Sequence, residues 1–166
     1  MDFEVENQTL LTFWGFSVST GWLVSFYLHE FLNPVAMVAF WTILMSMPVI
    51  ASIKWMSQQS NDSLPAPWVM TTALGLGMSF AVVEGYMSVP EIESYAMFWF
   101  FLPAVAFSST TYYVKGFLAH LYTSAALANF VMAAILLFQP QVVAQYYILA
   151  AVFQGLPLLY HGYYEF

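Results

Sequence analysis

The sequence of 166 residues contains neither cysteine nor arginine, and Lys54 and Lys115 are its only lysines. Without cysteine there can be no disulfide, no thiolate nucleophile and no thiolate metal ligand. Proteins that bind nucleic acid neutralise its phosphates with clustered lysine and arginine. Two lysines far apart in the sequence cannot form such a cluster, so we expect no nucleic-acid partner.

Charge of either sign is scarce. Charged residues make up 7% of the chain and hydrophobic residues 61%, whereas soluble domains carry about 25% charged residues. So few charges cannot cover a water-exposed surface. The composition therefore predicts an integral membrane protein whose main partner is the lipid bilayer.

Six apolar segments are long enough to cross a membrane, because about 20 helical residues span a hydrocarbon core of about 30 Å. They are Leu10–Leu28, Val35–Trp55, Trp68–Met87, Ser94–Val114, Leu121–Phe138 and Gln145–Tyr164. Their length and uniform hydrophobicity predict helices. We expect an all-α, multi-pass protein with six transmembrane helices and a single domain over residues 1–166.

Prolines and small residues alternate along these segments. Prolines stand before the second, fourth and sixth segments and again inside them: Pro34, Pro90 and Pro140, then Pro48, Pro103 and Pro157. The odd-numbered segments instead carry small residues four positions apart, as in Gly15/Ser19, Gly75/Ser79 and Ser124/Ala128. Small residues let helix backbones approach closely in lipid, and interior prolines bend helices. The pattern predicts three tandem hairpins, each pairing a straight helix with a proline-kinked one.

The two lysines predict the orientation. Lys54 ends the second segment and Lys115 follows the fourth, so six spans place both on one face. Cytoplasmic loops are enriched in lysine and arginine. Both termini are therefore expected in the cytoplasm.

Three ionisable residues are candidates for an ion or ligand pathway. Glu84 lies six positions before Pro90, near the inner edge of the predicted interface, where a carboxylate is costly unless it is paired or hydrated. His29 and Glu30 close the first segment on the same predicted face. We interpret Glu84 as a coupling or coordinating carboxylate with His29 and Glu30 as neighbours. The alternative is that Glu84 only marks the helix end in the headgroup layer.

Two amides are expected near the middle of the membrane, Asn129 in the fifth segment and Gln154 in the sixth. Such amides commonly form hydrogen bonds between helices, and they can also contact a ligand. Both interpretations stay open at this point.

The sequence gives little evidence for a metal site or for a nucleophilic catalytic residue. His29, His120 and His161 show no local spacing typical of metal ligands, and no base stands next to a nucleophilic hydroxyl. We therefore assign no metal site, no catalytic residue and no cofactor. The aromatic residues near predicted helix ends, such as Trp68, Tyr86 and Tyr112, are expected in interfacial belts.

Three functions are compatible with these features. The leading hypothesis is a small transport-type or ligand-binding helix bundle with a polar pathway around Glu84, which takes an ion or a small lipophilic ligand. The second is a non-catalytic subunit of a larger membrane complex or homo-oligomer. The third is an intramembrane enzyme that acts on an isoprenoid-like substrate with Glu84 as general acid. The first requires a cavity, the second a flat apolar face, and the third a closed pocket with two convergent ionisable groups.

Overall fold

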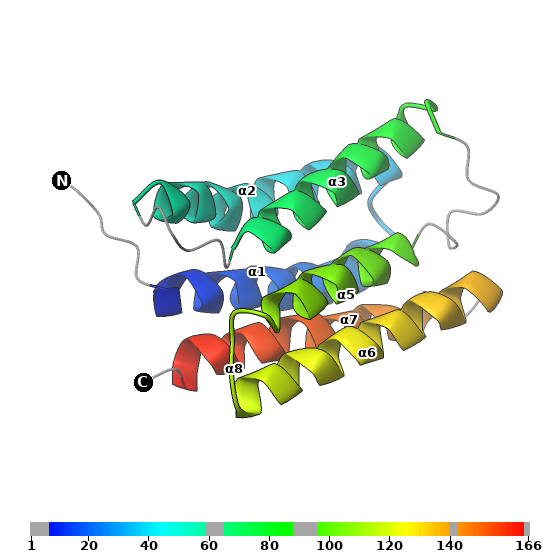
Figure 1. Cartoon of the computed structure of the whole chain (residues 1–166). Helices are drawn as coiled ribbons and strands as arrows, with labels where there is room; N and C mark the ends of the chain where they lie inside the picture. Colours follow the sequence, from blue (N-terminus) through cyan, green and yellow to red (C-terminus); the bar gives the residue numbers. More distant parts are fainter. Residues whose placement is uncertain (1–6, 59–64, 88–95, 140–142, 165–166) are drawn as a thin grey trace.

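The computed structural model describes residues 7–58, 65–87, 96–139 and 143–164, and within these ranges the chain is helical apart from short turns (Figure 1). The first five helices are α1 (Asn7–Leu28), α2 (Pro34–Gln58), α3 (Ala66–Val83), α5 (Phe98–Thr110) and α6 (Phe117–Phe138). The C-terminal helix has three consecutive parts, α7 (Val143–Ala150), the π-helical turn η1 (Ala151–Gly155) and α8 (Leu156–Tyr164).

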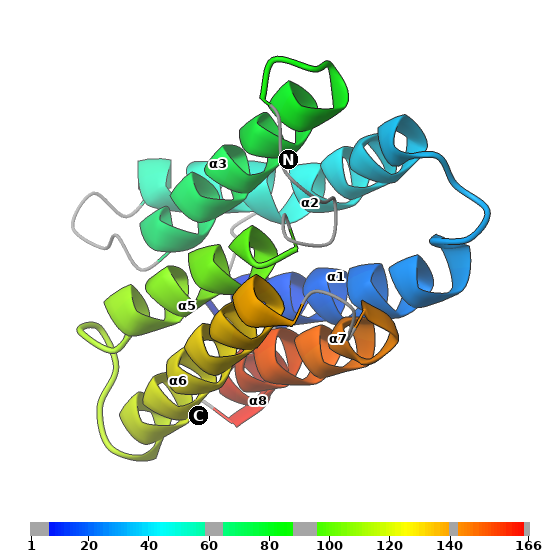
Figure 2. The same ribbon diagram turned by 90° about the vertical axis from the view of Figure 1, so that its right-hand side faces the viewer.

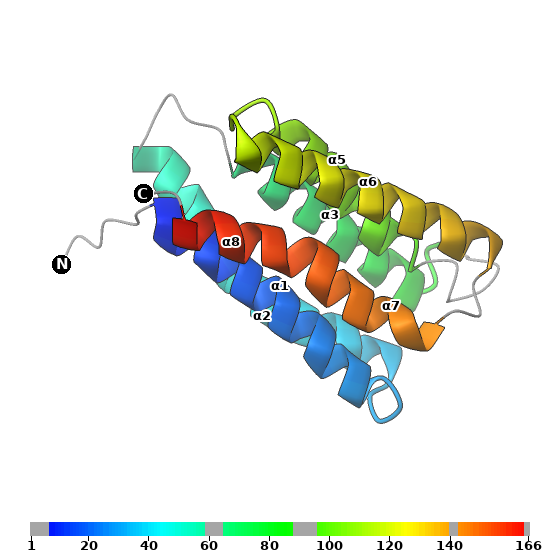
Figure 3. The same ribbon diagram turned by 90° about the horizontal axis from the view of Figure 1, so that it is seen from below.

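The helices form a closed ring. Each described helix packs against the described helices that precede and follow it along the chain, and the C-terminal helix packs against both α6 and α1 (Figures 1 and 2). Seen from below, α1 lies beside α7 and α8 along their whole length (Figure 3). The ring places the inward faces of all these helices around one core.

The predicted all-α class is confirmed, and every predicted segment contains a helix. Three described helices are both long and apolar enough to cross a membrane, namely α2, α3 and α6, and α5 is a shorter apolar helix. The total of six spans is not confirmed. The packing does not single out three hairpins either, because α1 contacts the C-terminal helix more extensively than it contacts α2. The hairpin repeat stays a prediction, and Pro90 and Pro140 lie outside the described residues.

The bundle has a largely hydrophobic core that includes several polar side chains, and its outer surface carries many large apolar side chains. On the outer face of α2, Ile43, Met47 and Ile50 are 60–72% exposed. The buried polar residues are Ser17, Ser25, Ser52, Thr71, Thr72, Ser79, Thr110, Asn129, Gln154 and His161. An apolar outer surface of this kind suits contact with lipid, which agrees with the predicted membrane association.

A close helix contact joins α1 to the C-terminal helix. A Cβ atom added to Gly15 would lie 2.6 Å from the Leu159 nitrogen, and one added to Gly155 would overlap the Ser19 hydroxyl. Ser19 Oγ donates to the Ala151 carbonyl at 3.2 Å. The expectation that Gly15 and Ser19 permit close backbone approach is therefore confirmed.

The interior prolines lie where the sequence indicated. Pro48 lies inside α2, Pro103 inside α5, and Pro157 is the second residue of α8. Proline cannot donate the hydrogen bond to the preceding turn. The π-helical turn η1 directly before Pro157 is one of the ways in which a helix accommodates that loss.

Two glycines pack against tryptophan rings from neighbouring helices. A Cβ at Gly21 would lie 2.6 Å from the Trp41 ring, and one at Gly75 would lie 3.0 Å from the Trp99 ring. The missing side chains thus let the outer edges of both indoles approach the neighbouring helices closely. These two rings form part of the site described next.

Candidate ligand-binding site

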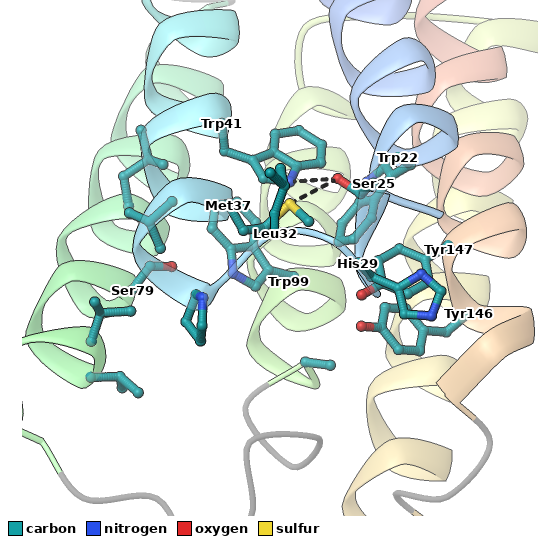
Figure 4. A pocket seen from close by; sticks show the side chains of 16 residues that line it. Trp22, Ser25, His29, Leu32, Met37, Trp41, Ser79, Trp99, Tyr146 and Tyr147 are labelled. Atoms are coloured by element: carbon teal, nitrogen blue, oxygen red, sulfur yellow. Dashed lines mark hydrogen bonds between the residues drawn. The ribbon is translucent and has the colours of Figure 1, made fainter. Parts of the chain in front are cut away.

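A cavity of about 410 Å³ opens at one end of the bundle, where α1 and α3 end and α2, α5 and α7 begin (Figure 4). Its aromatic wall consists of Trp22, Trp41, Trp99, Tyr146 and Tyr147. Its polar side chains are Ser25, His29 and Ser79, and aliphatic residues from the helix ends complete it. Pockets of this size and composition typically hold small molecules.

The periodicity of α1 supplies one wall. Trp22, Ser25 and His29 are three and four positions apart, so they project from the same helix face. The opposite wall comes from α2 and α3, with Ser79 on α3 (Figure 4).

Three indole rings meet at the inner end of the cavity. The ring centroids of Trp22 and Trp41 are 5.0 Å apart, those of Trp41 and Trp99 6.0 Å, and those of Trp22 and Trp99 6.4 Å. Such edge-to-face and stacked contacts are favourable arrangements for aromatic pairs. We refer to Trp22, Trp41 and Trp99 as the indole cluster.

Two of these indoles direct their N–H groups into the protein. Trp41 Nε1 donates to Ser25 Oγ at 3.0 Å, and Ser25 Oγ lies 3.5 Å from the Met37 sulfur (Figure 4). Trp22 Nε1 donates to Gln154 Oε1 at 2.9 Å. Both donors are therefore occupied by protein acceptors.

His29 stands in the wall beside Tyr147, with ring centroids 5.2 Å apart, and is partly exposed. Its Nδ1 lies 2.6 Å from the Phe26 carbonyl oxygen. Because a carbonyl only accepts hydrogen bonds, Nδ1 is the donor here. Nε2 is then the ring nitrogen that remains for a ligand.

Gln154 connects the indole cluster to α5 and α6. Its Nε2 lies 2.9 Å from both Asn129 Oδ1 and the Trp99 carbonyl. Asn129 Nδ2 donates in turn to the Ala125 carbonyl at 2.8 Å. Asn129 and Gln154 are 0% and 2% exposed, so both amides are buried.

A second, much smaller space lies on the inner side of the indole cluster. It measures about 30 Å³ and is lined by Gln154, Thr71 and Thr72 together with the same three indoles. A space of this size is large enough to hold a water molecule. The indole cluster thus separates the open cavity from the bundle interior.

The predicted site residues fall into three places. His29 lines the cavity, while Glu30 is exposed immediately after it. Glu84 is the exposed C-terminal cap of α3, directly after the cavity residue Val83, and is not among the lining residues. Asn129 and Gln154 contact each other through Asn129 Oδ1 and Gln154 Nε2, on the inner side of the indole cluster. The pathway role of these five residues stays a prediction.

Sequence reasoning missed the aromatic wall, although the sequence held signals of it. One signal was the helical spacing of Trp22, Ser25 and His29. A second was Gly21 and Gly75, because glycine leaves space for a large ring from a neighbouring helix. The expected position of Trp68 in an interfacial belt was wrong, because Trp68 is 4% exposed and donates to Thr110 Oγ1 at 3.1 Å. Tyr86 and Tyr112 are highly exposed, as a belt requires.

A shallower apolar groove of about 750 Å³ lies between α6 and the C-terminal helix. Its wall is almost entirely hydrocarbon and aromatic ring, with Pro157, Tyr160 and Tyr164 on one side and Ala128 on the other. A surface of this kind suits a lipid chain and offers no converging polar groups. The cavity with the indole cluster is therefore the candidate site.

No protein-family model, no curated protein and no solved structure matches this chain.

Proposed function

We propose that this chain is a six-span membrane protein that binds a small lipophilic ligand in the cavity beside the indole cluster. The observation that carries the proposal is the cavity itself. It is about 410 Å³ in volume, largely aromatic, and holds a few polar groups from different helices. Small-molecule ligands and cofactors are usually bound in pockets of this size and composition.

The membrane arrangement is supported by charge and surface. Lys54 and Lys115 lie at the end of the bundle where α1 begins and α8 ends (Figure 1). Glu30 and Glu84 lie at the other end, next to cavity residues. Since lysines mark the cytoplasmic side, the proposal puts both termini in the cytoplasm and the cavity mouth on the opposite side.

Binding is favoured over the rival functions by the shape of the cavity. A continuous transport pathway is not supported, because the indole cluster closes the inner end. A purely structural subunit would have no need of such a cavity. An enzyme that uses Glu84 as general acid is not favoured, because Glu84 lies outside the wall and the described lining residues include no carboxylate.

Binding can be tested with two probes of equal shape, benzyltrimethylammonium and neopentylbenzene. They differ in one atom, a positively charged nitrogen in place of carbon. Bound probe is measured by equilibrium dialysis of the full chain in lipid nanodiscs, with empty nanodiscs as the reference for partitioning into lipid. We expect saturable binding of at least one probe at one site per chain.

A matched pair of variants locates the site. Val38 lines the cavity and is half-buried, so Val38→Trp should fill it and reduce binding at least tenfold. Val131 lies on the outer face of α6 at 50% exposure, so Val131→Trp adds the same ring without touching the cavity. If neither probe binds the wild type above the level of Val38→Trp, the proposed function is wrong.

A further inference from the structure

We infer that the cavity selects an organic cation, specifically an ammonium ion that carries apolar substituents. This inference rests on the proposed function and names the chemical class of its ligand. It follows from three features that the binding proposal does not require: the aromatic faces, the occupied donors and the distribution of charge.

The wall offers a concentration of π surface. Besides the indole cluster, Tyr147 lies with its ring centroid 6.0 Å from that of Trp22, and Tyr146 lies at 6.2 Å. Cations are attracted to the faces of Trp and Tyr rings within about 6 Å of the centroid, and sites for quaternary ammonium ions use several such rings together. Five such rings, from α1, α2, α5 and α7, line this one cavity.

An anion would find little to bind. Recognition of carboxylates and phosphates needs charged or N–H donors. The Trp22 and Trp41 donors already bond Gln154 and Ser25, and no lysine lines the wall. The Trp22 and Trp41 rings therefore offer carbon atoms, rather than N–H groups, to a ligand.

The charged side chains that the structure describes lie so as to attract a cation to this end. Lys54 is 20 residues along α2 from the cavity residue Pro34, which corresponds to about 30 Å at the helical rise. Glu30 and Glu84 are exposed immediately beside the lining residues His29 and Val83. Carboxylates near a cleft raise the local concentration of cations and their rate of association.

The same wall argues against a metal ion. Calcium and magnesium require several oxygen ligands, carboxylates above all, and the described wall contains no carboxylate. A weakly hydrated organic cation needs no such ligands, because its apolar substituents contact the rings directly. The chemistry therefore favours an ammonium ion over a hard metal cation.

The charge preference is tested with the same two probes. We expect benzyltrimethylammonium to bind at least tenfold more tightly than neopentylbenzene. Trp99→Leu removes a π face but keeps apolar bulk, so the preference should fall at least fivefold, while Trp99→Phe should retain most of it. Tyr147→Leu with Tyr147→Phe forms an independent pair in case the first variant does not fold. Equal affinity of the two probes would overturn the inference and leave the binding proposal intact, whereas no binding of either probe refutes the binding proposal.

An ammonium group can belong to a free solute or to the choline headgroup of a lipid. The dialysis is therefore repeated in nanodiscs of phosphatidylethanolamine and of phosphatidylcholine, two lipids without net charge that differ in the methyl groups of the ammonium. Weaker probe binding in phosphatidylcholine identifies the lipid headgroup as a competing ligand of the same class. Equal binding in both lipids identifies a free ammonium ion as the ligand. Tighter binding of the neutral probe in both lipids would refute the cation preference.

Discussion

Removal of the buried Gln154 amide should destabilise the bundle more than any single change on its surface. The side chain makes three hydrogen bonds, to Trp22 Nε1, the Trp99 carbonyl and Asn129 Oδ1, all at 2.9 Å. These bonds tie α1, α5 and α6 to the π-helical turn. Gln154→Leu keeps the volume of the side chain but abolishes all three.

The magnitude follows from the environment. Hydrogen bonds between helices in a membrane average about 0.6 kcal/mol each, so three predict a loss of about 2 kcal/mol in the free energy of unfolding. The loss can be larger because the Trp22 donor is left buried without a partner, which costs about 1–3 kcal/mol. Both estimates predict that Gln154→Leu lowers the free energy of unfolding by about 1–3 kcal/mol.

The assay is reversible unfolding in mixed micelles of increasing sodium dodecyl sulfate, followed by circular dichroism at 222 nm. Thr123→Ala serves as the control, because Thr123 is exposed and bonds only a carbonyl of its own helix, Ala119 O at 2.7 Å. That control should change the unfolding free energy by less than about 0.5 kcal/mol.

A double-mutant cycle separates the Trp22–Gln154 bond from general packing. Trp22→Phe removes one of the three bonds, so Trp22→Phe and Gln154→Leu should couple, with the double variant less destabilised than the sum of the single ones. Strict additivity, or a Gln154→Leu variant as stable as the wild type, would refute the role assigned to this network.

Two further predictions concern packing and topology. Gly155→Ala should destabilise the bundle by about 1–3 kcal/mol, because its Cβ would overlap the Ser19 hydroxyl, whereas Gly77→Ala meets no atom within 4 Å and should be neutral or stabilising in the same unfolding assay. Ser19→Gly should rescue part of the Gly155→Ala loss, and no rescue would contradict the contact. Because the chain has no cysteine, single cysteines can report sidedness. Gln58→Cys and Tyr112→Cys should react with a membrane-impermeant maleimide from one side, and Glu30→Cys and Gln139→Cys from the other. Labelling of all four from the same side would refute six spans.

Much of the fold was predictable from composition and local pattern. Scarce charge and long apolar runs indicate lipid-facing helices whatever the tertiary structure, because backbone groups in lipid must bond within a helix. The positions of Pro48 and Pro103 inside helices, and the close approach at Gly15 and Ser19, also follow from local sequence. Each of these features is indicated by residues within a few turns of one another, although only the structure shows which helix packs against Gly15 and Ser19.

The candidate site could not be predicted in the same way. Glu84 attracted attention as a rare carboxylate, yet its exposure at the end of α3 depends on where that helix stops, at Val83 rather than Met87. The aromatic wall joins residues more than one hundred positions apart, as in Trp22 with Tyr146 and Tyr147. No local pattern encodes that meeting.

The sequence by itself determined that the chain forms apolar helices suited to a membrane, and that it has no thiol and no cluster of basic residues. Only the tertiary structure decided which faces turn inward, because an aromatic side chain is equally compatible with lipid, interface and core. The closure of the ring by α1 and the C-terminal helix brings Trp22 to Gln154 and the indoles to one cavity. Contacts between distant segments, not residue type, brought these aromatic side chains together around one cavity.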